Sequence, residues 1–181
     1  ADLALPWCRV VSMVDAGPSL GAVVYAEMPV EAVACEGRNG LVSGWLYAPS
    51  DSPAAASSAE PGVSHAKVRV PPQPVPDDWV TGRRWRLGAV SKWLQREHNN
   101  ISEGRCVVLA VQRLTRTRSR RRCKMLVVTD SQVVFGVFRK GRTRNPGLLY
   151  LARRLAALCM GYQVRLSLRY VPSAKNLADG P

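Results

Sequence analysis

The sequence predicts a mixed α/β domain, and two observations lead to this fold class. Short apolar runs rich in β-branched residues alternate with longer segments whose apolar residues recur every three or four positions, the patterns of strands and amphipathic helices. Read in order, the elements are strand, strand, strand, helix, strand, helix, helix, strand. This order is typical of a mixed sheet with helical crossovers. The chain has 181 residues, which we expect to form a single domain, 1–181.

The N-terminal part begins with a predicted hairpin. Residues 8–14 and 21–28 are rich in β-branched and other apolar residues, and a turn containing Gly and Pro joins them. A third strand is expected within 41–47. In 49–78, Pro, Ala and Ser dominate, and this composition predicts an insertion of low order. Residues 79–93 contain three tryptophans and are expected to include a short helix, with the rings packed in or beside the core.

The second half of the chain alternates helices and strands. Apolar residues in 101–114 fall on one helical face, and the short apolar run 125–129 suits a buried strand. Alternating apolar residues predict a last strand in 163–171. Capping residues predict two further helices, one begun by Ser131 and continuing to about Lys140 before Gly141, the other begun by Pro146, covering 148–160 and ended by Gly161.

The charge balance indicates a phosphate-rich partner. Lysine and arginine number 26 against 13 acidic residues, which gives a net charge of +13. Such an excess favours nucleic acid over an acidic small molecule, but it is shared by ribosomal proteins, histone-like proteins and nucleases. The basic residues concentrate in 113–124 and 139–144, for which a solvated loop is the alternative interpretation. Stacking on bases is the alternative role for the tryptophans.

The cysteines and histidines exclude a zinc finger. Five cysteines are scattered without a CxxC spacing, and only two histidines accompany them. This odd number of cysteines, some of them inside apolar runs, suits reduced thiols in an intracellular, reducing compartment. No apolar stretch is long enough to span a bilayer and no signal peptide opens the chain, so we expect no membrane partner. The abrupt ends indicate a segment of a longer protein.

Two aspartates follow apolar runs at the ends of predicted strands. Asp15 ends the first run, and Asp130 ends the run 125–129. If these strands are parallel neighbours, the carboxylates emerge about 5 Å apart, at the sheet edge where α/β proteins bind ligands. Two such charges raise each other's pKa unless a cation lies between them. The pair predicts a metal site, with turn capping as the alternative for each aspartate.

Glu103 has two interpretations, and the sequence leaves both open. Residues 100–103, Asn-Ile-Ser-Glu, match a capping box in which the glutamate bonds the cap backbone. Glu103 also lies four residues before Val107, and therefore along the apolar stripe of the helix, where an acid is often a metal ligand. Asp179, near the C-terminus, is by default a loop residue.

The order of these pieces resembles ribonuclease H, specifically the ribonuclease H domain attached to retrotransposon reverse transcriptases. The resemblance covers 8–179 except about 48–79. Its motifs are short, but all occur in the family's order: Asp15-Ala16 before the glycine-led strand 21–25, Asn99-Asn100-Ile101-Ser102-Glu103, which is similar to the first-helix motif of tyrosine-recombinase-type elements, Thr129-Asp130-Ser131-Gln132, 140–148 and 171–179.

The resemblance implies a ribonuclease-H-like sheet of five strands in the order 3-2-1-4-5, flanked by helices, and hydrolysis of the RNA strand of RNA–DNA hybrids. It implies that Asp15, Glu103, Asp130 and Asp179 hold two Mg²⁺ ions, which Mn²⁺ can replace. Asp15 and Asp130 are then the primary ligands, Glu103 also contacts the 2′-hydroxyl, and Asp179 is the more mobile ligand. In one departure, Ser173-Ala174-Lys175 stands where several cellular members carry a histidine.

The resemblance also implies partners. We expect a domain that is monomeric in isolation, fused or adjacent to a reverse transcriptase domain, and bound to an RNA–DNA hybrid. A catalytically silent hybrid-binding module is one alternative. An integrase-type strand-transfer enzyme is another, which the absence of an acid in 148–160 disfavours. The residues expected to contact nucleic acid are Ser131, Arg116, Arg118, Arg120, Arg121, Arg122, Lys124, Arg139, Lys140, Arg142, Arg144 and Asn176.

Overall fold

The sheet has five strands in the order β3-β2-β1-β4-β5, which confirms the predicted fold class and order. The computed structural model describes residues 5–39, 75–81, 85–95 and 97–179. Neighbours β1 and β2 are antiparallel, as are β2 and β3, whereas β4 is parallel to both β1 and β5. The strands are β1 (Val10–Ala16), β2 (Leu20–Glu27), β3 (Arg86–Lys92), β4 (Lys124–Thr129) and β5 (Arg165–Tyr170).

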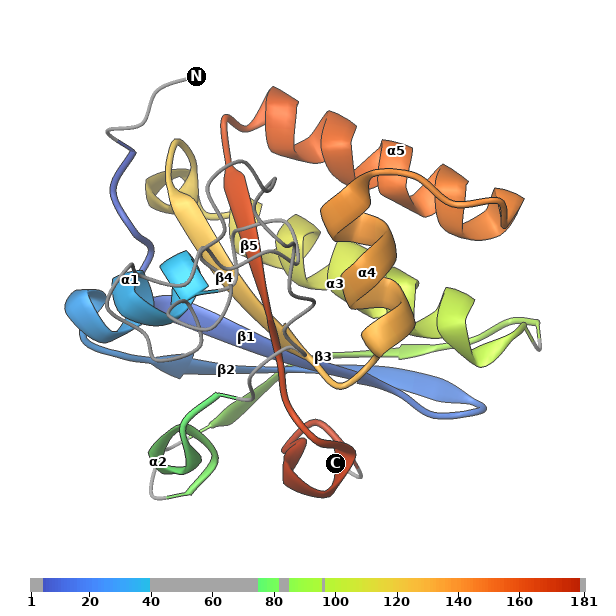
Figure 1. Ribbon diagram of the computed structural model, residues 1–181, viewed down its shortest axis with the longest axis horizontal. Helices are drawn as coiled ribbons and strands as arrows, with labels where there is room; N and C mark the ends of the chain where they lie inside the picture. The colour runs from blue at the N-terminus through green and yellow to red at the C-terminus, as the bar shows by residue number, and fades with distance from the viewer. Residues whose placement is uncertain (1–4, 40–74, 82–84, 96, 180–181) are drawn as a thin grey trace, which may run out of the picture.

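Helices lie on both faces of the sheet. Helices α3, α4 and α5 cover one face, and α1 and α2 lie against the other (Figure 1). Among the described residues, no helix combines the length and apolar composition needed to cross a membrane. The helices are α1 (Val30–Asn39), α2 (Asp77–Val80), α3 (Asn99–Thr115), α4 (Gln132–Lys140) and α5 (Pro146–Gly161), with short 3₁₀ turns η1 (Arg118–Arg120) and η2 (Ser173–Lys175).

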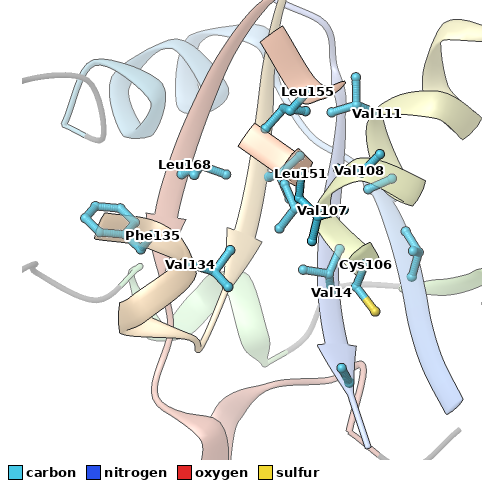
Figure 2. Close-up of a cluster of buried hydrophobic side chains, with 14 of the residues drawn as sticks. Val14, Cys106, Val107, Val108, Val111, Val134, Phe135, Leu151, Leu155 and Leu168 are labelled. Carbon is cyan, nitrogen blue, oxygen red and sulfur yellow. The ribbon is translucent and has the colours of Figure 1, made fainter. Parts of the chain in front are cut away.

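The core consists of two layers, because successive side chains of a strand point to opposite faces of the sheet. Met13 of β1 is fully buried in the cluster that contains Val33 of α1. The next residue, Val14, is fully buried on the other face, in the cluster that contains Val107 of α3 and Leu151 of α5 (Figure 2). Packing on both faces fixes β1 firmly, and the strand ends beside the start of α3.

The third strand differs from the sequence prediction. Strand β3 occupies Arg86–Lys92, within the segment where a short helix was expected, and the strand predicted in 41–47 lies outside the described residues. The strand was missed because β3 is at the edge of the sheet and lacks an alternating apolar pattern: Leu87 and Val90 are exposed, and Ala89 is buried. Helix α1 was also not predicted.

The predicted insertion is described only at its C-terminal end. Residues 49–74 lie outside the described part of the chain, whereas 75–78 are described, with Val75 buried and 76–78 exposed. Val75 is 3 % exposed and belongs to the core cluster that contains Met13 and Val33. Its backbone N–H donates to Tyr170 O at 3.1 Å. Trp79 is also buried in this cluster, as the core interpretation of the tryptophans requires. Val75 therefore belongs to the folded core, and the predicted insertion does not extend through it.

The predicted bounds of α4 and the predicted start of α5 are confirmed by their caps. The Ser131 side chain accepts a hydrogen bond from Val134 N at the start of α4, and Gly141 ends that helix with a φ of 63°. A left-handed residue after a helix favours glycine, because glycine has no Cβ. Pro146 begins α5 directly after Asn145, whose side chain accepts from Leu148 N at 3.0 Å.

Candidate metal centre and nucleic-acid surface

Asp15 and Asp130 lie side by side at one edge of the sheet. Val14 of β1 pairs with Thr129 of β4 in parallel register, so the residue after each emerges at the carboxyl edge of neighbouring strands. This confirms the parallel adjacency on which the predicted metal site depends. Both residues are half-buried, which removes part of the solvent that would otherwise screen their charges.

Glu103 joins the two aspartates from α3. The N-cap of α3 is His98, whose side chain accepts from Asn100 N, so the capping-box interpretation of Glu103 is wrong. The Glu103 side chain is instead buried, with the residue 5 % exposed. One carboxylate oxygen from each of Asp15, Glu103 and Asp130 lies within 4.8 Å of the other two. The ligand interpretation of Glu103 therefore fits the structure.

Close packing of α3 on the hairpin brings Glu103 to this position. The Cys106 thiol donates to Asp15 O at 3.0 Å, which ties the helix to the end of β1. A Cβ on Gly21 of β2 would lie only 2.3 Å from Cys106 Sγ, so the helix can approach this closely because position 21 is glycine. Burial raises the pKa of the Cys106 thiol, so the thiol stays protonated and able to donate.

Burial and neighbouring negative charges make the ionised forms of Glu103 and Asp15 unfavourable. Glu103 Oε2 and Asp130 Oδ1 are buried and have no hydrogen-bond partner. Burial, followed by the charges of Asp130 and Asp15, raises the pKa of Glu103 to about 8. Burial, followed by the charges of Asp130 and Asp179, raises the pKa of Asp15 to about 6. Buried acceptors with no donor, in a cluster of like charges, suit a hard divalent cation such as Mg²⁺.

The fourth predicted ligand, Asp179, is separate from the three clustered carboxylates. It is exposed on the segment that follows β5, and its charge is one of the causes of the raised pKa of Asp15. It does not belong to the group whose ligand atoms converge. The structure thus brings three of the four predicted ligands together and places Asp179 at their periphery.

Asn176 is a site residue whose position the sequence did not indicate. It is 5 % exposed, and its Nδ2 donates to Val14 O at 3.0 Å and to Asp15 Oδ1 at 3.2 Å. Its Oδ1 accepts from Ala178 N at 3.1 Å. These bonds orient the Asp15 carboxylate and hold the segment that carries Asp179. The contact predicted between Asn176 and nucleic acid stays a prediction.

The two basic segments follow different helices, 116–124 after α3 and 139–144 at the end of α4. A Cβ on Gly147 would lie 2.9 Å from the side chain of Ile101, so the start of α5 lies beside the carboxylate end of α3. The segment 139–144 runs from the last residues of α4 towards α5, and its residues Arg139 and Gly141 border α5 near Cys159. The run 116–124 follows the other end of α3, and Arg116 is about 20 Å from Glu103 along the helix axis at 1.5 Å per residue. Contact between nucleic acid and either segment, or Ser131, stays a prediction.

A cavity of about 350 Å³ lies between α4, α5 and β5, away from the carboxylates. Its walls include Leu155, Cys159 and Leu168. Arg139, one of the residues predicted to contact nucleic acid, also borders it and lies over the Phe135 ring at 5.5 Å. None of the four candidate ligands lines this cavity, so it is separate from the candidate metal site at the sheet edge.

Comparison with known proteins identifies the fold. No protein-family model and no curated protein matches the sequence. Among solved structures, LC11-RNase H1 in complex with an RNA/DNA hybrid aligns at 12 % identity with a TM-score of 0.51, covering 93 % of this chain and 89 % of that one.

Two further solved structures align at lower TM-scores. RNase H1 from Halobacterium salinarum aligns at 16 % identity and a TM-score of 0.46, covering 94 % and 91 % of the two chains. The foamy viral protease-reverse transcriptase in complex with an RNA/DNA hybrid aligns at 11 % identity and 0.37, covering 97 % of this chain and 38 % of that one. With the strand order above, the alignment to LC11-RNase H1 shows that this chain has the ribonuclease-H-like fold.

Proposed function

We propose that this protein is a metal-dependent endonuclease that hydrolyses the RNA strand of RNA–DNA hybrids. The observation that carries the proposal is the convergence of Asp15, Glu103 and Asp130 within 4.8 Å at the carboxyl edge of a ribonuclease-H-like sheet. Two of their buried oxygens have no hydrogen-bond partner, which fits ligands of a cation. LC11-RNase H1, which shares the fold, forms a complex with an RNA/DNA hybrid.

Asp15, Glu103, Asp130 and Asp179 would hold the metal ions, for which Mg²⁺ is the proposed identity and Mn²⁺ a substitute. Two such ions, when bound, supply a Lewis acid for the phosphodiester, an activated water and stabilisation of the leaving oxygen. The strand ends of β1 and β4 fix Asp15 and Asp130, and Asn176 orients Asp15. Preformed ligand positions reduce the ordering that substrate binding would otherwise require.

The protonation of Glu103 should make metal binding depend on pH. With a pKa of about 8, its carboxyl group holds a proton at neutral pH until a cation displaces it. Metal affinity should therefore increase with pH, since binding releases a proton. The ionised Glu103 is also the group proposed to accept a hydrogen bond from the ribose 2′-hydroxyl, which distinguishes RNA from DNA.

The cellular context is part of the proposal and rests on the sequence resemblance. We propose a domain of a retroelement reverse transcriptase that acts on the hybrid made during reverse transcription, in a reducing intracellular compartment. The excess of basic residues over acidic ones, 26 to 13, supports a polyanionic substrate. The isolated domain is proposed to be monomeric.

The direct test is a cleavage assay on labelled RNA in a hybrid. The parent chain should cut the RNA strand in Mg²⁺, not in EDTA, and should leave single-stranded RNA and duplex DNA largely intact. Asp130→Asn should lower turnover by about 10³-fold or more, because Asp130 would support both metal ions in the proposed site. Glu31→Gln, which removes an exposed acid of α1, is the control and should retain activity.

The assay has two outcomes that would contradict the proposal. Equal cleavage in EDTA would indicate a nuclease that needs no metal ion. Tight hybrid binding without any cleavage in Mg²⁺ or Mn²⁺ would instead support the silent binding module.

A further inference from the structure

The end of α3 remote from the carboxylates carries a second concentration of polar groups. Tyr25 of β2 packs against the core cluster that contains Leu114, near the end of α3, and Cys123. The Cys123 thiol donates to Arg120 O at 3.2 Å, so η1 is held beside the same cluster. Tyr25, the last turn of α3 and η1 therefore lie together.

Two buried donors at this place have no hydrogen-bond partner. They are the Tyr25 hydroxyl and Nε of Arg113. A buried polar group without a partner is unfavourable, and most such groups in folded proteins are satisfied. The Arg113 group can only donate and the Tyr25 hydroxyl can donate, so a single acceptor between them would satisfy both.

Positive charge surrounds these donors. Burial is the largest influence on the Tyr25 hydroxyl and raises its pKa, and the charges of Arg113, Arg120 and Arg116 act in the opposite direction. Within the part of the chain that the structure describes, none of these three arginines forms an ion pair. Donors combined with arginines that no acid neutralises are the groups that recognise phosphate.

The dipole of α3 does not explain this charge. Its last carbonyls favour a nearby cation, and Arg121 already fills that role. The Nε of Arg121 donates to Thr115 O at 2.8 Å, and its guanidinium lies 4.8 Å from the centre of the Tyr162 ring. Arg113, Arg116 and Arg120 therefore remain for another anion.

We propose that Tyr25, Arg113, Arg116 and Arg120 form a phosphate-binding site at this end of α3. Resting on the proposed function, the phosphate is one of the backbone phosphates of the hybrid whose RNA strand reaches the carboxylates. Arg113 lies about 15 Å from Glu103 along the helix, which corresponds to about four steps of one strand at 3.4 Å each. This separation is shorter than a hybrid duplex of two helical turns, so the second site would set the position of a duplex that reaches both.

The experiment compares Arg116→Gln/Arg120→Gln with Arg153→Gln/Arg154→Gln, a matched pair of exposed arginines on α5. Binding of a 20-base-pair hybrid (about 68 Å at 3.4 Å per step) is measured in EDTA by fluorescence anisotropy at several salt concentrations. The first pair should weaken binding and reduce the salt slope by about 0.7–0.9 log units for each phosphate that is no longer neutralised. Tyr25→Phe should weaken binding by up to about tenfold, since it removes one donor to a charged group, and the control pair should weaken binding less.

A second measurement distinguishes backbone phosphate from free phosphate. Inorganic phosphate in a phosphate-free buffer should raise the melting temperature of the parent more than that of Tyr25→Phe or Arg116→Gln/Arg120→Gln. A phosphate effect with unchanged hybrid binding would assign the site to free phosphate. If neither phosphate nor hybrid distinguishes these variants from the control pair, the site does not exist. Because binding is measured in EDTA, absence of cleavage in Mg²⁺ would contradict the proposed function alone.

Discussion

The carboxyl group of Glu103 is held where its charge is unfavourable, and this should make the stability of the metal-free protein depend on pH. Its folded-state pKa of about 8 lies above the ordinary value of 4.5, so the folded state binds the proton more tightly. The stabilisation is complete below about pH 4.5 and is lost as the pH rises through about 8. In EDTA, the melting temperature should fall over this range.

Glu103→Gln tests this directly, because glutamine keeps the shape of the side chain and cannot ionise. The melting temperature of the variant should depend less on pH between 5 and 8 than that of the parent. Glu31→Gln, on the exposed side of α1, should follow the parent curve. A Glu103→Gln curve that coincides with the parent would show that this carboxyl group does not titrate as expected.

Asp15 links the same repulsion to metal binding. Asp15→Asn removes one of the clustered charges, so it should raise the melting temperature in EDTA while it lowers cleavage by orders of magnitude. Millimolar Mg²⁺ should raise the melting temperature of the parent and affect the variant much less, since a cation stabilises only the state that binds it. A parent whose melting temperature ignores Mg²⁺ would contradict a formed metal site.

The sequence predicted some residues of the site and not others, for physical reasons. Asp15 and Asp130 could be predicted because each follows a buried strand, and neighbouring parallel strands end at the same edge. The role of Asn176 could not, because its partners, Val14 O and Asp15 Oδ1, are more than a hundred residues away in the sequence. The capping box misled because the helix begins two residues earlier, at Asn99 after the N-cap His98.

At the scale of elements, helix α1 is attached to β5 by a buried ion pair. Arg169 and Glu36 lie 2.8 Å apart with side chains 7 % and 9 % exposed, and Nε of Arg169 also donates to Glu36 at 2.9 Å. Removing one partner of a buried pair leaves a desolvated charge and typically costs about 3–5 kcal/mol. Glu36→Ala should therefore destabilise the fold on the order of 3 kcal/mol, as measured by urea unfolding.

The exposed pair of Arg105 and Glu97 is the matched control. Its atoms also approach within 2.7 Å, but the side chains are 41 % and 30 % exposed. Surface pairs contribute about 0–1 kcal/mol, so Glu97→Ala should have a small effect. Equal destabilisation in the two variants would show that burial is not what makes the α1–β5 pair important.

The central elements that the sequence predicted differ in burial from the edge strand β3 that it missed. Strands β1 and β4 and helix α3 are buried on one or both faces, so their apolar periodicity is clear. Strand β3 exposes most of its residues at the sheet edge, and pairing with β2, which acts over a long sequence distance, determines its structure. Edge strands therefore need tertiary information that periodicity does not contain.

At the scale of the whole molecule, the clustered negative charges and the basic run 116–124 lie at different places. The carboxylates gather at one edge of the sheet, and the basic run 116–124 lies at the far end of α3, about 20 Å away. This separation lets a metal site of high negative charge coexist with a net charge of +13. The same separation is why a duplex, and not a mononucleotide, fits the proposed function.

The domain organisation supplies the last prediction. The composition of 54–74, rich in Pro, Ser and Ala, offers little apolar surface to offset the entropy of ordering, so a short Gly/Ser linker in its place should leave the melting temperature and cleavage nearly unchanged. A replacement that extends through Pro76 should be destabilising, because it also removes Val75, which is buried and bonded to Tyr170 O. Losing a buried valine costs about 1.5–3 kcal/mol in burial alone. Equal stability of the two deletions would show that Val75 contributes nothing, and unfolding of the shorter deletion would show that the fold needs 54–74.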